Sequence, residues 1–205
     1  MNDKQLIMIA KVTSALFTPF YLPLVAMITL FMFSYLSLLP LYYKLACLFI
    51  TYLFTILLPT LLIRIYLRYQ GWRPIHLRIK DRRIIPYIIS ILCYFTCYHL
   101  MSALNMPHFR GVVVITALAV QILCSMINIW WKVSMHSAAI GGMTGGLIAF
   151  SLLFNFNPIW WLCLIILLSG IVGSSRMTLR QHSLAQVLVG YGVGIVTAFT
   201  TIIIM

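Results

Sequence analysis

Two histidines stand at the beginning of long apolar runs, each among other polar residues. His136 lies in WKVSMHSAAIGG with Lys132 and Ser134, and His182 lies in SRMTLRQHSLAQ with Arg176. At the start of a helix, free backbone amides and the helix dipole favour an anion. Imidazole, ammonium and guanidinium groups at two such positions point to a bound phosphate.

The spacing in the second segment is informative. Five residues separate Arg176 from His182, and Gln186 follows four residues later, on the same helical face one turn deeper. A glutamine carbonyl there can accept the imidazole N–H, although it offers no negative charge. The whole chain has only two acidic residues against fourteen lysines and arginines, which leaves almost nothing to hold a hard cation. We therefore predict a site without metal or cofactor.

The elements that position these residues are membrane helices. The chain is 63% hydrophobic and 8% charged, whereas about a quarter of residues are charged in soluble domains. Each apolar run is close to the ~20 residues that a helix needs to cross the hydrocarbon. These runs lie near 14–38, 42–63, 86–104, 111–131, 137–155, 158–173 and 183–205. We predict an all-α polytopic membrane bundle of six or seven transmembrane helices, forming one domain over residues 1–205.

The cations are distributed unequally between the two membrane faces. With seven spans, the N-terminus, the segment 64–85, the junction 132–136 and the loop 174–182 share one face. That face carries twelve lysines and arginines, with Lys44 and Arg110 opposite. The positive-inside rule makes it cytoplasmic, and we expect a bacterial inner membrane. Cations in short loops favour anionic headgroups of the bilayer as partners, not nucleic acid.

The two polar segments resemble signatures of the type 2 phosphatidic acid phosphatase superfamily. Ser134 and His136 match the second signature, PSGH, and Ser175, Arg176 and His182 match the third, SRxxxxxHxxxD. For the first signature, KxxxxxxRP, we take KDRRIIP over residues 80–86 as the looser counterpart. The second signature lacks its proline and glycine here, and the third ends in glutamine where the family has aspartate.

The resemblance implies an integral membrane lipid phosphatase that needs no metal. His182 would attack phosphorus to form a phosphohistidine, with Gln186 holding its imidazole, and His136 would protonate the departing oxygen and later activate water. The substrate would be a phosphate or diphosphate of a membrane lipid, such as polyprenyl diphosphate, phosphatidate or phosphatidylglycerophosphate. The residues predicted to bind the phosphate are Arg176, Ser134, Ser175, Lys80, Arg83 and Lys132.

Residue 186 is a glutamine where the family has aspartate, and this leaves two alternative functions to consider. In the serine protease triad, replacing the acid by an amide costs ~10⁴ in rate. A non-catalytic relative that binds anionic lipid headgroups through the same residues is therefore one alternative. A small transporter is another, for which two-fold internal repeats are expected; none is recognisable in the sequence.

Overall fold

A computed structural model describes residues 3–33, 35–71, 84–104 and 108–205. The described residues are helical, without a strand among them, which confirms the predicted all-α class. The elements are α1 (Asp3–Leu16), α2 (Leu22–Phe33), the 3₁₀ turn η1 (Tyr35–Leu38), α3 (Leu41–Tyr52), the π segment η2 (Leu53–Leu57), α4 (Leu58–Tyr69), α5 (Ile84–Ala103), α6 (His108–Trp130), α7 (Met135–Phe154), α8 (Ile159–Thr178) and α9 (Leu184–Ile204).

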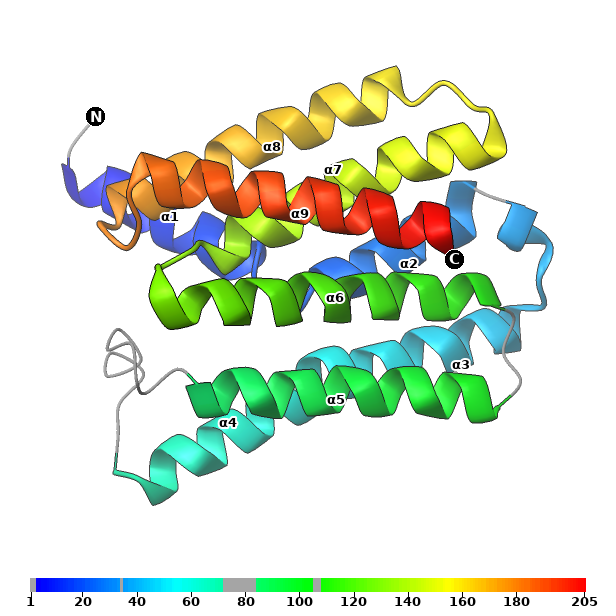
Figure 1. Cartoon of the computed structure of the whole chain (residues 1–205), viewed down its shortest axis with the longest axis horizontal. Helices are drawn as coiled ribbons and strands as arrows, with labels where there is room; N and C mark the ends of the chain where they lie inside the picture. Colours follow the sequence, from blue (N-terminus) through cyan, green and yellow to red (C-terminus); the bar gives the residue numbers. More distant parts are fainter. Residues whose placement is uncertain (1–2, 34, 72–83, 105–107) are drawn as a thin grey trace.

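Within the described ranges, six helical stretches are long and apolar enough to cross a membrane. They are Leu41–Tyr69, Ile84–Ala103, Gly111–Trp130, Met135–Phe154, Ile159–Thr178 and Leu184–Ile204. Figure 1 shows them running along one common direction, as expected of a polytopic bundle. Exposed tryptophans stand at both ends, Trp130 where α6 ends and Trp160 where α8 begins, at the levels where aromatic belts meet the headgroups.

The first apolar run differs from the prediction of one span near 14–38. It is divided, because α1 ends at Leu16 and α2 begins at Leu22. Pro19 lies in the break; proline lacks the N–H that a helix needs and disfavours helical geometry in the residue before it. The two short helices follow one another along the bundle, with α1 packed on α8 and α2 on α3 and α6. The end of α1 therefore lies inside the bundle.

The second run extends further than predicted. The predicted run ends near residue 63, but the helix continues from α3 through the π segment η2 into α4 and includes Arg64 and Arg68. Pro59 lies just after η2. Because proline cannot donate to the preceding turn, a wider π turn accommodates it there. Thr55 and Thr60 each return a hydroxyl hydrogen bond to the carbonyl four residues earlier.

Helices α7 and α9 pack more closely than any other pair, because glycines line their contact. A Cβ at Gly190 would lie 2.7 Å from the carbonyl oxygen of Ser134, and Cβ atoms at Gly141 and Gly145 would overlap backbone oxygens of α9. A Cβ at Gly194 would overlap the carbonyl of Ala138. Small residues at four-residue spacing let two backbones approach in this way.

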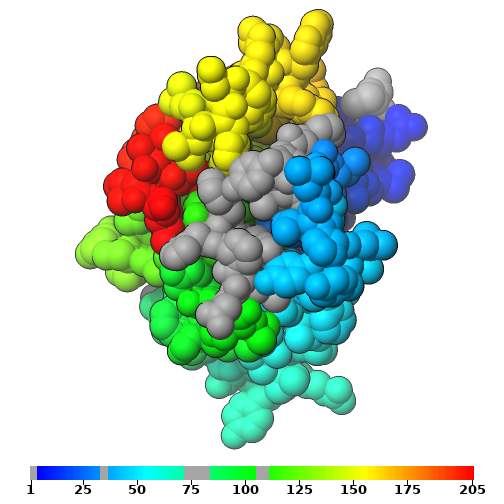
Figure 2. Space-filling model, turned by 90° about the vertical axis from the view of Figure 1, so that its right-hand side faces the viewer, coloured from blue at the N-terminus to red at the C-terminus, as the bar shows by residue number. Residues whose placement is uncertain are grey.

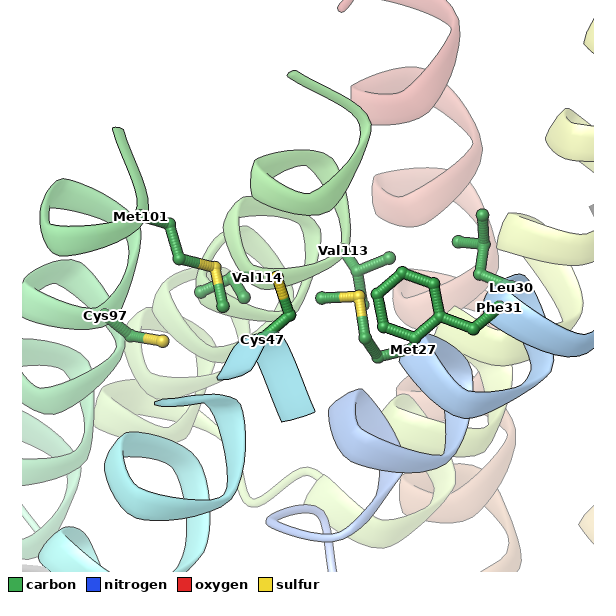
Figure 3. Close-up of a cluster of buried hydrophobic side chains, with 8 residues drawn as sticks. All are labelled: Met27, Leu30, Phe31, Cys47, Cys97, Met101, Val113 and Val114. Atoms are coloured by element: carbon green, nitrogen blue, oxygen red, sulfur yellow. The ribbon is translucent and has the colours of Figure 1, made fainter. Parts of the chain in front are cut away.

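A second group of buried side chains joins the remaining helices. Figure 3 shows Met27 and Phe31 of α2 beside Val113 of α6, and Cys47 of α3 near Cys97 of α5. This cluster attaches α2, α3 and α5 to α6, which also packs on α9. Helix α6 therefore connects the group formed by α2, α3 and α5 to the close pair formed by α7 and α9.

We call the end of the bundle where α4, α6 and α8 end and α5, α7 and α9 begin the cationic end (Figure 1). Its described cations are Lys4, Arg64, Arg68, Lys132, Arg176 and Arg180. Figure 2 looks onto the opposite end, with the α7–α8 connection, the C-terminus of α9 and the segments around the beginning of α3. There Lys44, near the start of α3, donates to the carbonyl of Ser37.

Candidate functional site

Helices α7 and α9 begin side by side, and each is capped by a serine. The Ser134 hydroxyl accepts from the N–H of Ser137 (3.3 Å), and the Ser183 hydroxyl accepts from the N–H of Gln186 (3.4 Å). The N–H of Ser134 donates to the backbone carbonyl of Gln186 (3.2 Å). This bond ties the two helix beginnings together, so the histidine near each cap is brought to the same place.

The second helix beginning also fixes the tautomer of His182. The side-chain oxygen of Gln186 accepts the backbone N–H of Ser183 (3.2 Å) and lies 3.2 Å from Nδ1 of His182. Since a backbone N–H only donates, the atom facing it is the amide oxygen, and that oxygen can bond Nδ1 only if Nδ1 carries the proton. In the neutral form of His182, Nε2 is then the unprotonated nitrogen and carries the lone pair that could act as a nucleophile.

His136 and Arg176 are joined through α1. Nε2–H of His136 donates to the carbonyl of Ser14 (3.2 Å), and the guanidinium of Arg176 donates to the hydroxyl of the same serine (2.6 Å). Ser14 is buried in the last turn of α1. Three helices, α1, α7 and α8, therefore hold the imidazole and the guanidinium next to each other.

The turn between α6 and α7 places Lys132. The side chain of Asn128 accepts from the N–H of Val133 (3.1 Å) and donates to the carbonyl of Cys124 (2.8 Å), which closes the turn over the end of α6. The ammonium group of Lys132 donates to the backbone carbonyl of Gln181. Lys132 therefore reaches the segment that precedes α9.

These side chains line one end of a cavity of about 1160 Å³. Its polar lining at the cationic end is Lys132, His136, Arg176, Arg180, Gln181 and His182. From there the cavity follows α7 past Ala139, Met143, Leu147 and Phe150 to Phe154 at the far end of that helix. The site thus combines a cationic end, suited to an anion, with a long apolar interior, suited to a hydrocarbon chain.

The chain's two acidic residues are Asp3, at the start of α1, and Asp81, and residues 84–205 contain no aspartate or glutamate. Arg176 and His182 lie close enough to His136 to interact with it electrostatically. A cluster of cationic side chains at one end of a cavity attracts anions, so this arrangement favours a bound anion. Within the part of the chain that the structure describes, no three histidine, cysteine, aspartate or glutamate side chains gather as a metal site would require.

The structure brings together four of the predicted residues, His136, His182, Arg176 and Lys132, with Gln186 supporting His182. Two predicted phosphate ligands have other surroundings. Ser134 is fully buried as the cap of α7 and is not among the residues that line the cavity. Ser175 donates to the carbonyl of Ile171 and borders a small crevice between α1 and α8. Lys80 and Arg83 lie outside the described residues.

Known proteins add no further information about the site. Comparison with protein families, curated proteins and solved structures found no match. The contacts, burial and charges described above are therefore the basis for a functional proposal.

Ser14 and Gln181 contribute to the site without having been predicted. Their partners are far away in sequence, since Ser14 contacts residues 122 and 162 positions later. The one signal for Ser14 was a polar residue within an apolar stretch, which is common in membrane helices and points to no particular partner. Gln181 contributes a backbone carbonyl, which no residue type could have indicated.

Proposed function

We propose that this chain is an integral membrane lipid phosphatase that needs no metal, of the type 2 phosphatidic acid phosphatase kind that its polar segments resemble. The observation that carries the proposal is the single cavity with two histidines and an arginine at one end and an apolar interior behind them. A lipid phosphate has the same division into an anionic head and a hydrocarbon chain.

The tautomer of His182 supports its role as the nucleophile. Its Nδ1–H is held by Gln186, so Nε2 forms the bond to phosphorus while the bond from phosphorus to the lipid oxygen breaks. His136 gives a proton to that leaving oxygen. For this step His136 must carry a proton on both nitrogens: Nε2–H is bonded to the Ser14 carbonyl, so the Nδ1–H proton goes to the leaving oxygen, and Nδ1 later takes a proton from the attacking water.

The cations supply the charge neutralisation that phosphoryl transfer needs. Arg176 and Lys132 hold the non-bridging oxygens, together with Lys80 and Arg83 as predicted from the sequence. Catalysis of this reaction rests mainly on positioning and electrostatic stabilisation, so a site of donors without carboxylates suits it. Polyprenyl diphosphate, phosphatidate and phosphatidylglycerophosphate are substrates of the required kind. We place the site at the cytoplasmic face of a bacterial inner membrane, from the excess of cations at the cationic end.

Phosphate release from purified protein tests the proposal. The protein in detergent is given a panel of prenyl diphosphates and phospholipids with a terminal phosphate, and the variant His182→Ala is compared with wild type. His99→Ala is the matched control, because His99 is exposed on α5 and does not line the cavity. We expect release by wild type and the control, and none by His182→Ala. Equal rates in wild type and His182→Ala would refute the proposal.

A second candidate function is binding of anionic lipid without hydrolysis. The neutral side chain of Gln186 favours it, because a phosphohistidine mechanism gains from a carboxylate beside the nucleophile. In that case vesicles containing phosphatidate bind the protein in a salt-sensitive way, yet no phosphate is released from any lipid. Binding with release excludes this candidate.

A further inference from the structure

One face of α7 lines the cavity along nearly the whole helix. The lining residues on this face recur every three or four positions, as expected for one side of a helix. Beyond His136 they include Ala139, Met143, Gly146, Phe150 and Phe154. Phe154 follows His136 by eighteen residues, which is roughly 27 Å of helix. The cavity is therefore nearly as long as the hydrocarbon core of a bilayer is thick, about 30 Å.

Gly146 marks the middle of this length. It follows His136 by ten residues, or roughly 15 Å of helix. That depth is about half the thickness of the hydrocarbon core, the share of one leaflet. A chain whose phosphate lies at the cationic end must pass Gly146 to enter the part of the cavity that ends at Phe154.

Gly146 differs from the glycines that bring α7 and α9 together. Cβ atoms at Gly141 and Gly145 would overlap backbone oxygens of α9. A Cβ at Gly146 would meet one atom within 4 Å, Cδ1 of Ile202 at 3.3 Å, which is the end of a flexible side chain. Close packing of backbones does not require a glycine here, and glycine is less favourable than alanine inside a helix. What the glycine provides is space in the cavity.

Helix α6 also presents a small residue at this level. It runs antiparallel to α7, and Val120 lies 3.7 Å from the position of a Cβ at Gly142. Ala117 is about one turn from Val120 towards the far end of the bundle, as Gly146 is one turn from Gly142. Ala117 and Gly146 both line the cavity. Two neighbouring helices therefore leave space at the same depth.

We propose that Gly146 determines the chain length that the cavity accepts, by keeping it open for a lipid phosphate whose hydrocarbon chain reaches past the middle of the membrane. A shorter chain ends before Gly146 and does not depend on it. The inference rests on the proposed function in one respect: it takes the phosphate of the ligand to lie at the cationic end.

Two probes with the same head and different chains test this role. Octyl phosphate and octadecyl phosphate have extended chains of roughly 10 and 23 Å, from about 1.3 Å per carbon, so only the second passes Gly146. Each is titrated in detergent into wild type and Gly146→Phe, and binding is measured by calorimetry. We expect Gly146→Phe to weaken binding of octadecyl phosphate by about tenfold or more, because its chain meets a filled space. Binding of octyl phosphate should stay as in wild type.

Gly170→Phe is the matched control. Gly170 is exposed on α8, a Cβ there would meet nothing within 4 Å, and the residue does not line the cavity. This variant should bind both probes as wild type does. Gly146→Ala, which adds only the Cβ to which Ile202 can yield, should retain octadecyl phosphate. If Gly146→Phe does not fold, the smaller Gly146→Leu should weaken octadecyl phosphate more than octyl phosphate.

Two results would overturn the inference: unchanged binding of octadecyl phosphate to folded Gly146→Phe, or an equal loss of both probes. Phosphate release from the same probes separates this inference from the proposed function. Selective loss of octadecyl phosphate binding, without phosphate release from either probe by wild type, would leave chain-length selection standing and remove the phosphatase. Release from both probes at rates that Gly146→Phe does not alter would do the opposite.

Discussion

Replacing Gly194 by alanine adds a single Cβ atom at the close contact between α7 and α9. The new Cβ would lie 2.7 Å from the backbone nitrogen of Gly142 and 2.8 Å from the carbonyl carbon of Ala138, and it would overlap the oxygen of that carbonyl. Real Cβ atoms essentially never approach other atoms within 3.0 Å. Since these neighbours are backbone and not flexible side chains, the two helices must move apart.

The separation required is on the order of 1 Å, judged from the approach distances that packed atoms need. Overpacking of this kind costs about 1–3 kcal/mol of stability. In a chain of this size each kcal/mol shifts Tm by roughly 2–4 °C, so we expect Tm to fall by about 2–12 °C. The bond from Ser134 to Gln186, 3.2 Å long, would stretch beyond hydrogen-bond range. A shift of that size between catalytic groups costs about 10²-fold in rate.

Thermal unfolding in detergent and phosphate release are measured on the same preparation. Gly192→Ala is the control, because Gly192 lies on the same helix and its Cβ would meet nothing within 4 Å. We expect the control to keep the Tm and rate of wild type. A Gly194→Ala protein that matches Gly192→Ala in both measurements would refute the claim that this contact positions the histidines.

Three further predictions concern the site directly. Gln186→Glu keeps the acceptor for His182 Nδ1–H and adds a negative charge, so kcat should rise, whereas Gln186→Leu should lower it by about 10²-fold or more; equal kcat values in the two variants contradict this role. Ser14→Ala removes a hydroxyl that Arg176 bonds but retains the carbonyl that holds His136, so KM should rise several-fold while kcat changes little; a large loss in kcat alone would oppose it. Thr178→Cys, made in a cysteine-free background, should resist an impermeant thiol reagent in intact cells if the cationic end is cytoplasmic; rapid labelling would reverse the orientation.

Much of the architecture could be predicted because membrane helices depend on local composition. Unbroken apolar runs must form helices to satisfy their own backbone groups in lipid, so α5, α6, α7 and α9 lie close to their predicted ranges. Helix α8 was predicted to end at 173 but continues to Thr178, so Ser175 and Arg176 belong to its last turns and not to a loop. The first run was misjudged, because Pro19 interrupts the helix without interrupting the hydrophobicity. The length of the helix that runs through η2 to Tyr69 was underestimated. Its arginines at the membrane end interrupt the hydrophobic run but do not end the helix.

The residue types and spacing of the two polar segments pointed by themselves to side chains that could carry chemistry, because imidazoles and cations close to the beginning of an apolar helix can bind an anion there. Only the tertiary structure decided which of these groups share a cavity. His136, Arg176 and Ser14 meet because three helices pack together, while Ser134 and Ser175, equally polar in sequence, are used within their own helices. The direction in which a side chain points depends on the rotation of its helix against its neighbours, and glycine contacts between α7 and α9 set that rotation through pairs of atoms far apart in the chain.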